Sequence, residues 1–179
     1  ANLAFLKIDI VEGGAERADS VQNALSQINP DVEYVAIHDA ARPVLADEWI
    51  SDIFAAAVEY GAAILGIPVS STLKRVADQE IEETVPRADL FQAQTPQVFE
   101  RSVIQEAYAK REGQVPTDDS QLVEQTGHRV HVVPGSALNI KITTQEDLKL
   151  AAAMLDLLPQ GNTRRGLNAP AEEKSNWLF

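Results

Sequence analysis

The chain has 179 residues, which is enough for one domain with its own hydrophobic core. Its formal net charge of -12 argues against non-specific binding to nucleic acid or to acidic membranes, because phosphate groups repel such a surface. The count of 0 cysteines excludes disulfides and thiolate zinc sites, and it agrees with a cytoplasmic protein. No apolar run is long enough to cross a bilayer, so we expect no membrane-spanning segment.

The first half of the chain predicts alternating strands and helices. Residues 6–11 alternate apolar and polar side chains, as a half-buried strand does. Helical spacing follows at 17–28 and returns at 47–61. The short apolar runs at 34–37 and 62–69 are typical of buried parallel strands. This order predicts an α/β fold, in the form of a Rossmann-like, mostly parallel sheet with flanking helices.

Residues 70–87 interrupt this alternation. Two strand-like runs at 72–76 and 81–85 are joined by a polar turn, which predicts a β-hairpin. An isolated hairpin is only marginally stable in water, so it must lean on its own domain or on a second subunit. We therefore expect a projecting hairpin arm.

The second half of the chain returns to helices and strands. Helical spacing at 103–108 is followed by the polar run Thr117–Ser120, which begins another helix. Helix caps are the simpler interpretation of this run, and catalytic residues are the alternative. Residues 129–133 alternate as a strand, and 143–146 fit a capping box at the start of the last helix.

An acid and a base stand directly after the apolar run at 34–37. Asp39 and Arg42 are separated by two alanines, whose small side chains let a ligand approach the backbone. Ligands of open parallel sheets bind beyond the carboxyl ends of the strands. A plain ion pair that closes a turn is the alternative. We expect His38 to be structural, because adjacent strand residues point to opposite faces.

Several stretches of the chain together resemble the 2-C-methyl-D-erythritol 4-phosphate cytidylyltransferase family. They occur in the family's order between about Leu6 and Leu158, and it is their combination that is specific. The stretches are GGAERADSV at 13–21, HDAARP at 38–43, STLKR at 71–75, AQTPQVF at 93–99 and NIKIT at 139–143.

The resemblance implies an α/β nucleotidyltransferase of the nucleotide-diphospho-sugar transferase type. Such an enzyme joins CTP and 2-C-methyl-D-erythritol 4-phosphate into 4-diphosphocytidyl-2-C-methyl-D-erythritol and pyrophosphate, in isoprenoid precursor biosynthesis. The family implies Mg²⁺ on the nucleotide phosphates, with protein ligands that the sequence does not identify. Positioning and charge neutralisation would do most of the catalysis, without a covalent enzyme intermediate. A sister enzyme that uses ribitol phosphate or another polyol phosphate is an alternative.

The resemblance also implies roles for residues of the main domain. Gly14, Ser20 and Ala40 match positions at the cytidine nucleotide. Asp39 matches an acid that holds the methylerythritol hydroxyls near the metal. The resemblance places one base at each reacting group: Arg42 at the sugar phosphate and Lys141 at the α-phosphate of CTP, where negative charge grows in the transition state.

Two further positions lie in the expected arm. Thr72 and Arg87 match family residues that reach the methylerythritol phosphate site of the neighbouring subunit. The resemblance therefore implies a homodimer in which each site is completed in trans. Ser71, where many relatives carry aspartate, is a departure that affects the hydrogen bonding of this arm.

A larger departure concerns the start of the family pattern, where a glycine-rich loop with an arginine and a lysine cradles the triphosphate. No stretch of this kind precedes the region that matches, so we expect residues 1–159 to form a cytidylyltransferase domain without its first βα units. In this division the arm is at 70–87, and residues 160–179 are a polar tail. On the same basis this chain alone would hold CTP weakly and fold poorly, and an inactive dimerisation scaffold is a further alternative.

Overall fold

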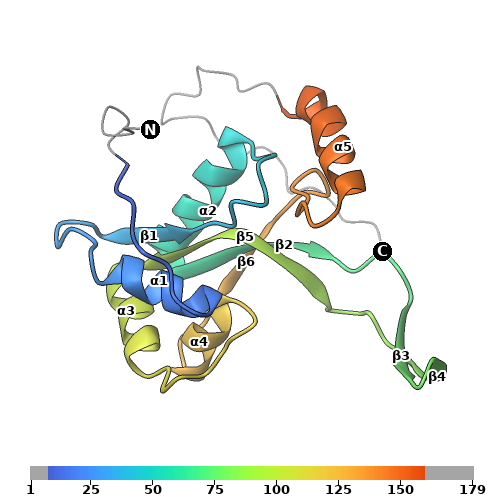
Figure 1. Ribbon diagram of the computed structural model, residues 1–179, viewed down its shortest axis with the longest axis horizontal. Coiled ribbons are helices and arrows are strands. Elements are labelled where there is room, and N and C mark those ends of the chain that lie inside the picture. The colour runs from blue at the N-terminus through green and yellow to red at the C-terminus, as the bar shows by residue number, and fades with distance from the viewer. Residues whose placement is uncertain (1–7, 160–179) are drawn as a thin grey trace.

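The computed structural model describes residues 8–159. It contains a central sheet with helices on both of its faces, and a hairpin that projects from one end (Figure 1). The helices are α1 (Arg17–Leu25), α2 (Asp47–Tyr60), α3 (Arg101–Ala109), α4 (Asp119–Gln125) and α5 (Gln145–Met154), followed by the short η2 (Leu155–Leu157). The strands are β1 (Tyr34–Ile37), β2 (Ala62–Pro68), β3 (Leu73–Ala77), β4 (Glu80–Val85), β5 (Phe91–Glu100) and β6 (His131–Pro134).

The four-stranded sheet has the order β1-β5-β2-β6. β5 is antiparallel to both β1 and β2, and β2 is parallel to β6. In this sheet β1, β2 and β6 therefore run in one direction and β5 runs against them. The predicted α/β fold with a mostly parallel sheet is confirmed, although β1 pairs with the antiparallel β5 and not, as its apolar run predicts, with a parallel strand.

Neighbouring residues of the sheet serve two separate cores, because successive side chains of a strand point to opposite faces. Phe99 packs with α1, α3 and α4 on one face. Val98, its neighbour, packs with Ile53 and Ala57 of α2 on the other face. Each of these four side chains is fully buried. Burial of a large apolar side chain contributes about 1.5–3 kcal/mol, so the two cores hold the layers together.

β5 carries an irregularity that matters for the site. Its register against β2 shifts between Ile64, which pairs with Gln97, and Leu65, which pairs with Gln94. The two residues left over in β5 are Thr95 and Pro96, which are joined by a cis peptide bond. Such a bulge bends a strand and redirects its side chains, often beside functional sites.

The strand that was predicted at residues 6–11 is absent from the part of it that the structure describes, residues 8–11. Ile10 is 79% exposed. A strand requires hydrogen bonds from a neighbouring strand. β1 pairs only with β5 among the described residues, and no described strand lies beside residues 8–11. The alternating pattern alone was therefore insufficient.

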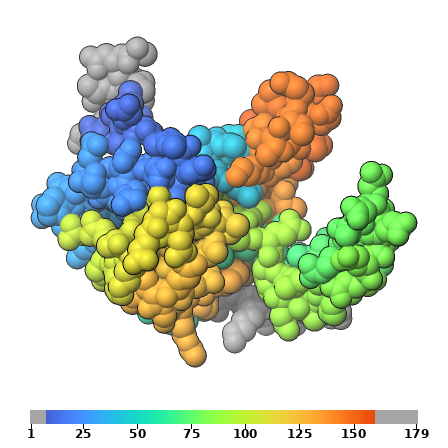
Figure 2. Space-filling view, turned by 60° about the horizontal axis from the view of Figure 1, so that its bottom comes forward, coloured from blue at the N-terminus to red at the C-terminus, as the bar shows by residue number. Residues whose placement is uncertain are grey.

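The hairpin arm is confirmed. β3 and β4 pair with each other as a separate two-stranded sheet, and the arm stands apart from the helices of the main body (Figure 2). Asp78 and Gln79 form its turn with φ values of 49° and 70°. Two successive residues with positive φ give the tight turn whose twist matches that of the flanking strands.

Helix caps agree in part with the sequence. Asp118 caps α4, since its Oδ1 accepts a hydrogen bond from the backbone N–H of Gln121 at 3.0 Å. Glu16 is the N-cap residue of α1. The side chain of Asp19 accepts a hydrogen bond from the backbone N–H of Glu16 at 3.0 Å.

The expectation of a polar tail at 160–179 lies outside the described residues. Within residues 8–159, no helix has the length and the apolar character needed to span a bilayer.

Candidate functional site

The loop after β1 holds Asp39 through hydrogen bonds to the bulge of β5. The backbone N–H of Asp39 donates to Thr95 Oγ1 at 3.0 Å. The ring of His38 contacts the same hydroxyl through Nδ1 at 3.1 Å and the carbonyl oxygen of Arg42 through Nε2 at 2.9 Å. Asn139 Nδ2 in turn donates to the carbonyl oxygen of Thr95 at 2.9 Å. These contacts fix the loop at both ends and agree with a structural role for His38.

Three basic side chains converge on the carboxylate of Asp39. Lys141 Nζ lies 2.9 Å from Oδ2, and Arg17 Nε lies 3.3 Å from Oδ1. Arg42 Nε is more distant, at 3.8 Å from Oδ2. The structure thus brings together Asp39, Arg42 and Lys141, which the sequence proposed, and adds Arg17.

The charges around Asp39 decide its ionisation. Burial favours the neutral acid, but the hydrogen bond and charge of Lys141 and the charge of Arg17 outweigh it, so the pKa of Asp39 is lowered. Burial also lowers the pKa of Arg42, against the attraction of Asp39. Arg42 stays charged at neutral pH because an arginine starts from so high a pKa. Asp39 is therefore a carboxylate over the physiological range.

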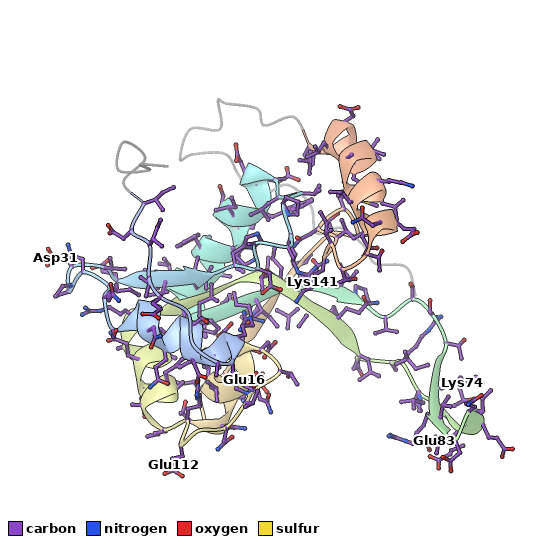
Figure 3. The ribbon with its side chains drawn as sticks, in the orientation of Figure 1. Glu16, Asp31, Lys74, Glu83, Glu112 and Lys141 are labelled. Carbon is purple, nitrogen blue, oxygen red and sulfur yellow. The ribbon has the colours of Figure 1, made fainter. Side chains whose placement is uncertain are left out.

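Arg42 and Lys141 differ in burial and in their hydrogen bonds. Arg42 is largely buried and donates from Nη1 to the carbonyl oxygen of Asn139 at 2.7 Å. The side chain of Lys141 is 47% exposed. Lys141 lies over the middle of the sheet, far from Lys74 and Glu83 of the arm (Figure 3). An exposed lysine on a flexible stem can leave Asp39 for a phosphate, whereas Arg42 is held in one orientation.

Two pockets meet at this charge cluster. One, of about 400 Å³, includes Ser20, Ala40 and part of α1 in its wall. The other, of about 230 Å³, includes Arg42 and the bulge of β5. Both share three lining residues, namely Arg17, Asp39 and Lys141. Groups bound in the two pockets would meet at these charges.

Gly14 and Ser20 lie close to each other beside the first pocket. The backbone N–H of Gly14 donates to Ser20 Oγ at 3.0 Å. A Cβ atom at Gly14 would lie 2.1 Å from the Cβ of Asp19, so only glycine fits there. The predicted nucleotide contacts Gly14, Ser20 and Ala40 therefore belong to one neighbourhood.

The two predicted arm residues lie elsewhere. Thr72 and Arg87 are exposed, and neither belongs to the lining of either pocket at Asp39. Within one chain the structure does not bring them to the site. This placement agrees with the expectation that they serve a second subunit, for which they stay a prediction.

The sequence did not single out Arg17 or Asp119 as members of this network. Arg17 Nη2 lies 2.7 Å from Oδ2 of Asp119, which is fully buried. Arg17 occurs within the motif at 13–21, which was the available signal for it. Asp119 was assigned to a set of caps, and its neighbour Asp118 is the cap.

A metal site formed only by protein side chains is not found among residues 8–159, which hold no group of three acidic or histidine side chains that could bind an ion. Asp39 is already surrounded by basic groups. The donor set therefore suits a cation that arrives with a phosphate ligand better than a resident ion.

A family model described as 2-C-methyl-D-erythritol 4-phosphate cytidylyltransferase matches residues 2–157. The chain belongs to this family. A relative with this name from Bacillus thuringiensis (strain Al Hakam) is 47% identical over 150 residues, covering 83% of the chain and 66% of the relative. One from Rhodopirellula baltica is 48% identical over 160 residues, covering 83% of the chain and 65% of the relative. The match thus spans slightly less than two thirds of these relatives.

Solved structures of the family agree with the fold. The crystal structure of 2-C-methyl-D-erythritol 4-phosphate cytidylyltransferase from Thermus thermophilus matches with a TM-score of 0.75 and 37% identity, covering 81% of this chain and 71% of that one. A structure from Francisella tularensis matches with a TM-score of 0.74 and 32% identity, covering 80% and 70%. The sequence resemblance to this family is confirmed.

Proposed function

We propose that the protein transfers the cytidylyl group of CTP to 2-C-methyl-D-erythritol 4-phosphate and releases pyrophosphate, in isoprenoid precursor biosynthesis. The observation that carries the proposal is the meeting of two pockets at Asp39 and Lys141, with Arg42 in one of them. The family to which the chain belongs supports the identity of both substrates. That the protein is cytoplasmic stays a prediction.

The reaction joins two anions. A phosphate oxygen of the sugar alcohol attacks the α-phosphorus of CTP, the new P–O bond forms, and the bond to the β-phosphate oxygen breaks as pyrophosphate leaves. In this proposal Lys141 leaves Asp39 and neutralises the negative charge that grows on the α-phosphate. Preorganised charge of this kind is commonly the largest contribution to phosphoryl-type transfer.

The other residues orient the substrates in this proposal. Asp39, held as a carboxylate, accepts hydrogen bonds from hydroxyl groups of the sugar alcohol. Arg42, fixed by the carbonyl oxygen of Asn139, faces its phosphate end. Ser20 and the backbone around Gly14 and Ala40 form the side of the pocket for cytidine. Each of these groups brings a reactant closer to in-line geometry.

Magnesium is proposed as the cation of the reaction. Mg²⁺ keeps several waters and commonly binds through substrate phosphates rather than through a cage of protein ligands. It would supply charge neutralisation on the triphosphate when bound.

A homodimer is proposed through the hairpin arm. The arm is paired only with itself among the described residues, and it exposes Val76 and Ile81 near its tip. Thr72 and Arg87 would then enter the sugar-phosphate site of the partner. This arrangement accounts for two polar residues that lie away from the site of their own chain.

Pyrophosphate release tests the proposal. The protein is assayed with CTP, Mg²⁺ and 2-C-methyl-D-erythritol 4-phosphate, and in parallel with ribitol 5-phosphate or no acceptor. We expect release only with the methylerythritol phosphate. Equal or faster release with ribitol 5-phosphate would replace the proposed acceptor, and no release with any acceptor would contradict the proposed activity.

A further inference from the structure

A buried carboxylate lies behind the charge cluster. Asp119 is the first residue of α4 and is 0% exposed. Burying a charge is costly unless it is paired and hydrogen-bonded. Both oxygens of Asp119 have partners: Oδ2 lies 2.7 Å from Arg17 Nη2, and Oδ1 accepts from the hydroxyl of Tyr108 at 2.6 Å.

Tyr108 secures this carboxylate from α3. Its side chain is buried, and burial together with the neighbouring Asp119 raises the pKa of the Tyr108 phenol far above its usual range. The phenol therefore remains a hydrogen-bond donor at every pH at which the protein works. Three helices, α1, α3 and α4, meet in the contact of Arg17, Tyr108 and Asp119.

Arg17 connects the buried carboxylate to the site. While Nη2 faces Asp119, its Nε lies 3.3 Å from Oδ1 of Asp39. The guanidinium is a rigid planar fork, so fixing one edge of it orients the other. Asp119 itself lines neither of the two pockets, whereas Arg17 lines both. Asp119 is thus one residue removed from any bound substrate.

We propose that Asp119, supported by Tyr108, is a positioning residue that anchors Arg17 so that Asp39 keeps a fixed partner when Lys141 turns to the substrate. The inference rests on the proposed function, because Lys141 leaves Asp39 only in that reaction. The carboxylate partners of the two bases support it: Lys141 contacts Asp39, whereas Arg17 contacts both Asp39 and the buried Asp119.

A test that does not depend on activity follows the Nε–H signal of Arg17 by ¹H–¹⁵N NMR, assigned by its loss in Arg17→Lys. In the wild type we expect a resolved signal from the hydrogen bond to Asp39. Asp119→Asn keeps the size of the side chain and removes its charge, and the signal should move to the position of exposed arginines. Tyr108→Phe, which leaves the charge in place, should shift the signal in the same direction by less.

Glu124→Gln is the matched control. Glu124 is an exposed acid of the same helix that contacts the hydroxyl of Ser120 at 3.2 Å. It should leave the Arg17 signal unchanged. Thermal unfolding verifies that each variant is folded. An unchanged Arg17 signal in folded Asp119→Asn would overturn the proposal, and if that variant does not fold, an unchanged signal in Tyr108→Phe would overturn it.

Kinetics supply a second test. Asp119→Asn should lower kcat about tenfold or more, with little change in the KM for CTP, because misplacing an orienting group slows the reaction more than it weakens binding. The double variant Arg17→Lys with Asp119→Asn should be no slower than Arg17→Lys alone, since both changes remove the same interaction between Arg17 and Asp119. Multiplying effects would overturn the anchoring role. Absence of turnover in the wild type would contradict only the proposed function. The NMR test would still show whether Asp119 positions Arg17.

Discussion

The loop around Asp39 and the hairpin arm differ in where their side chains make contacts. At Asp39, side chains from α1, from the loop after β1 and from the segment after β6 converge on one carboxylate, the most distant of them at 3.8 Å. In the arm, β3 and β4 pair with each other, and Thr72 and Arg87 are exposed away from the pockets of the same chain. The contrast agrees with the proposal that the loop serves the site of its own subunit and that the arm serves a second copy.

The largest effect should come from the site. Lys141→Ala is expected to lower kcat about 10²-fold or more, because one preorganised charge at a developing anion is commonly worth that much. Steady-state pyrophosphate release measures it. Lys149→Ala, an exposed lysine of α5, is the control and should leave kcat unchanged. Full activity of Lys141→Ala would remove Lys141 from the catalytic residues.

A smaller and more selective effect is expected from the arm. Arg87→Ala should raise the KM for the sugar phosphate about tenfold with little effect on the KM for CTP, since loss of a hydrogen bond to a charged group costs about 1.5–3 kcal/mol. Arg75→Ala on the same arm is the control, because Arg75 pairs with Glu83 at 2.7 Å. A rise confined to CTP, or an equal rise in both variants, would contradict binding in trans.

Hydroxyl groups of the two regions should differ in their contribution to stability. Thr95→Val leaves the N–H of Asp39 without its acceptor in a partly buried place, which should lower the free energy of unfolding by about 1–3 kcal/mol. Thr84→Val removes an exposed hydroxyl of the arm and should cost less. Urea unfolding compares the two. Equal losses would show that the Thr95 contact is not important for stability.

The smallest effect concerns pH. The pKa of Asp39 is lowered in the folded protein, so its contribution to stability is complete above the ordinary carboxyl value of about 3.9 and is lost as pH falls through the lowered pKa. Asp39→Asn should therefore lose less stability than the wild type when pH is taken from 7 to 3. Thermal unfolding at both pH values measures this difference, and identical losses would mean that Asp39 titrates alike in the folded and unfolded states.

Local patterns predicted the arm and the helices well. The hairpin follows from two short runs with a polar turn between them. The helical spacing at 47–61 agrees with α2, which Gly61 ends in the left-handed conformation. The antiparallel direction of β5 could not be predicted from local patterns, because strand pairing joins residues far apart in the chain. The alternation at 6–11 failed for the same reason, since it describes one strand and not its neighbour.

The site residues that lie within the family motifs could be predicted from the sequence. Those that reach the site only through the packing of distant segments could not. Asp39, Arg42 and Lys141 lie within such motifs and meet in the structure. Asp119 lies 102 residues from Arg17 in the sequence, so nothing local marks it as the partner of that arginine. The same is true of Thr95, whose hydroxyl reaches Asp39 only because β5 bulges there.

The bulge has a consequence for how the chain tolerates change in length. It divides β5 into a half that packs in the cores and a half that leads to the arm, and each half has its own register against β2. Inserting or deleting one residue in the half of β5 that leads to the arm would shift that half. Phe99 and Val98, on the other side of the bulge, would keep their side chains on the same faces of the sheet. The arm can thus be lengthened, shortened or re-aimed toward a partner while the interior of the domain stays the same.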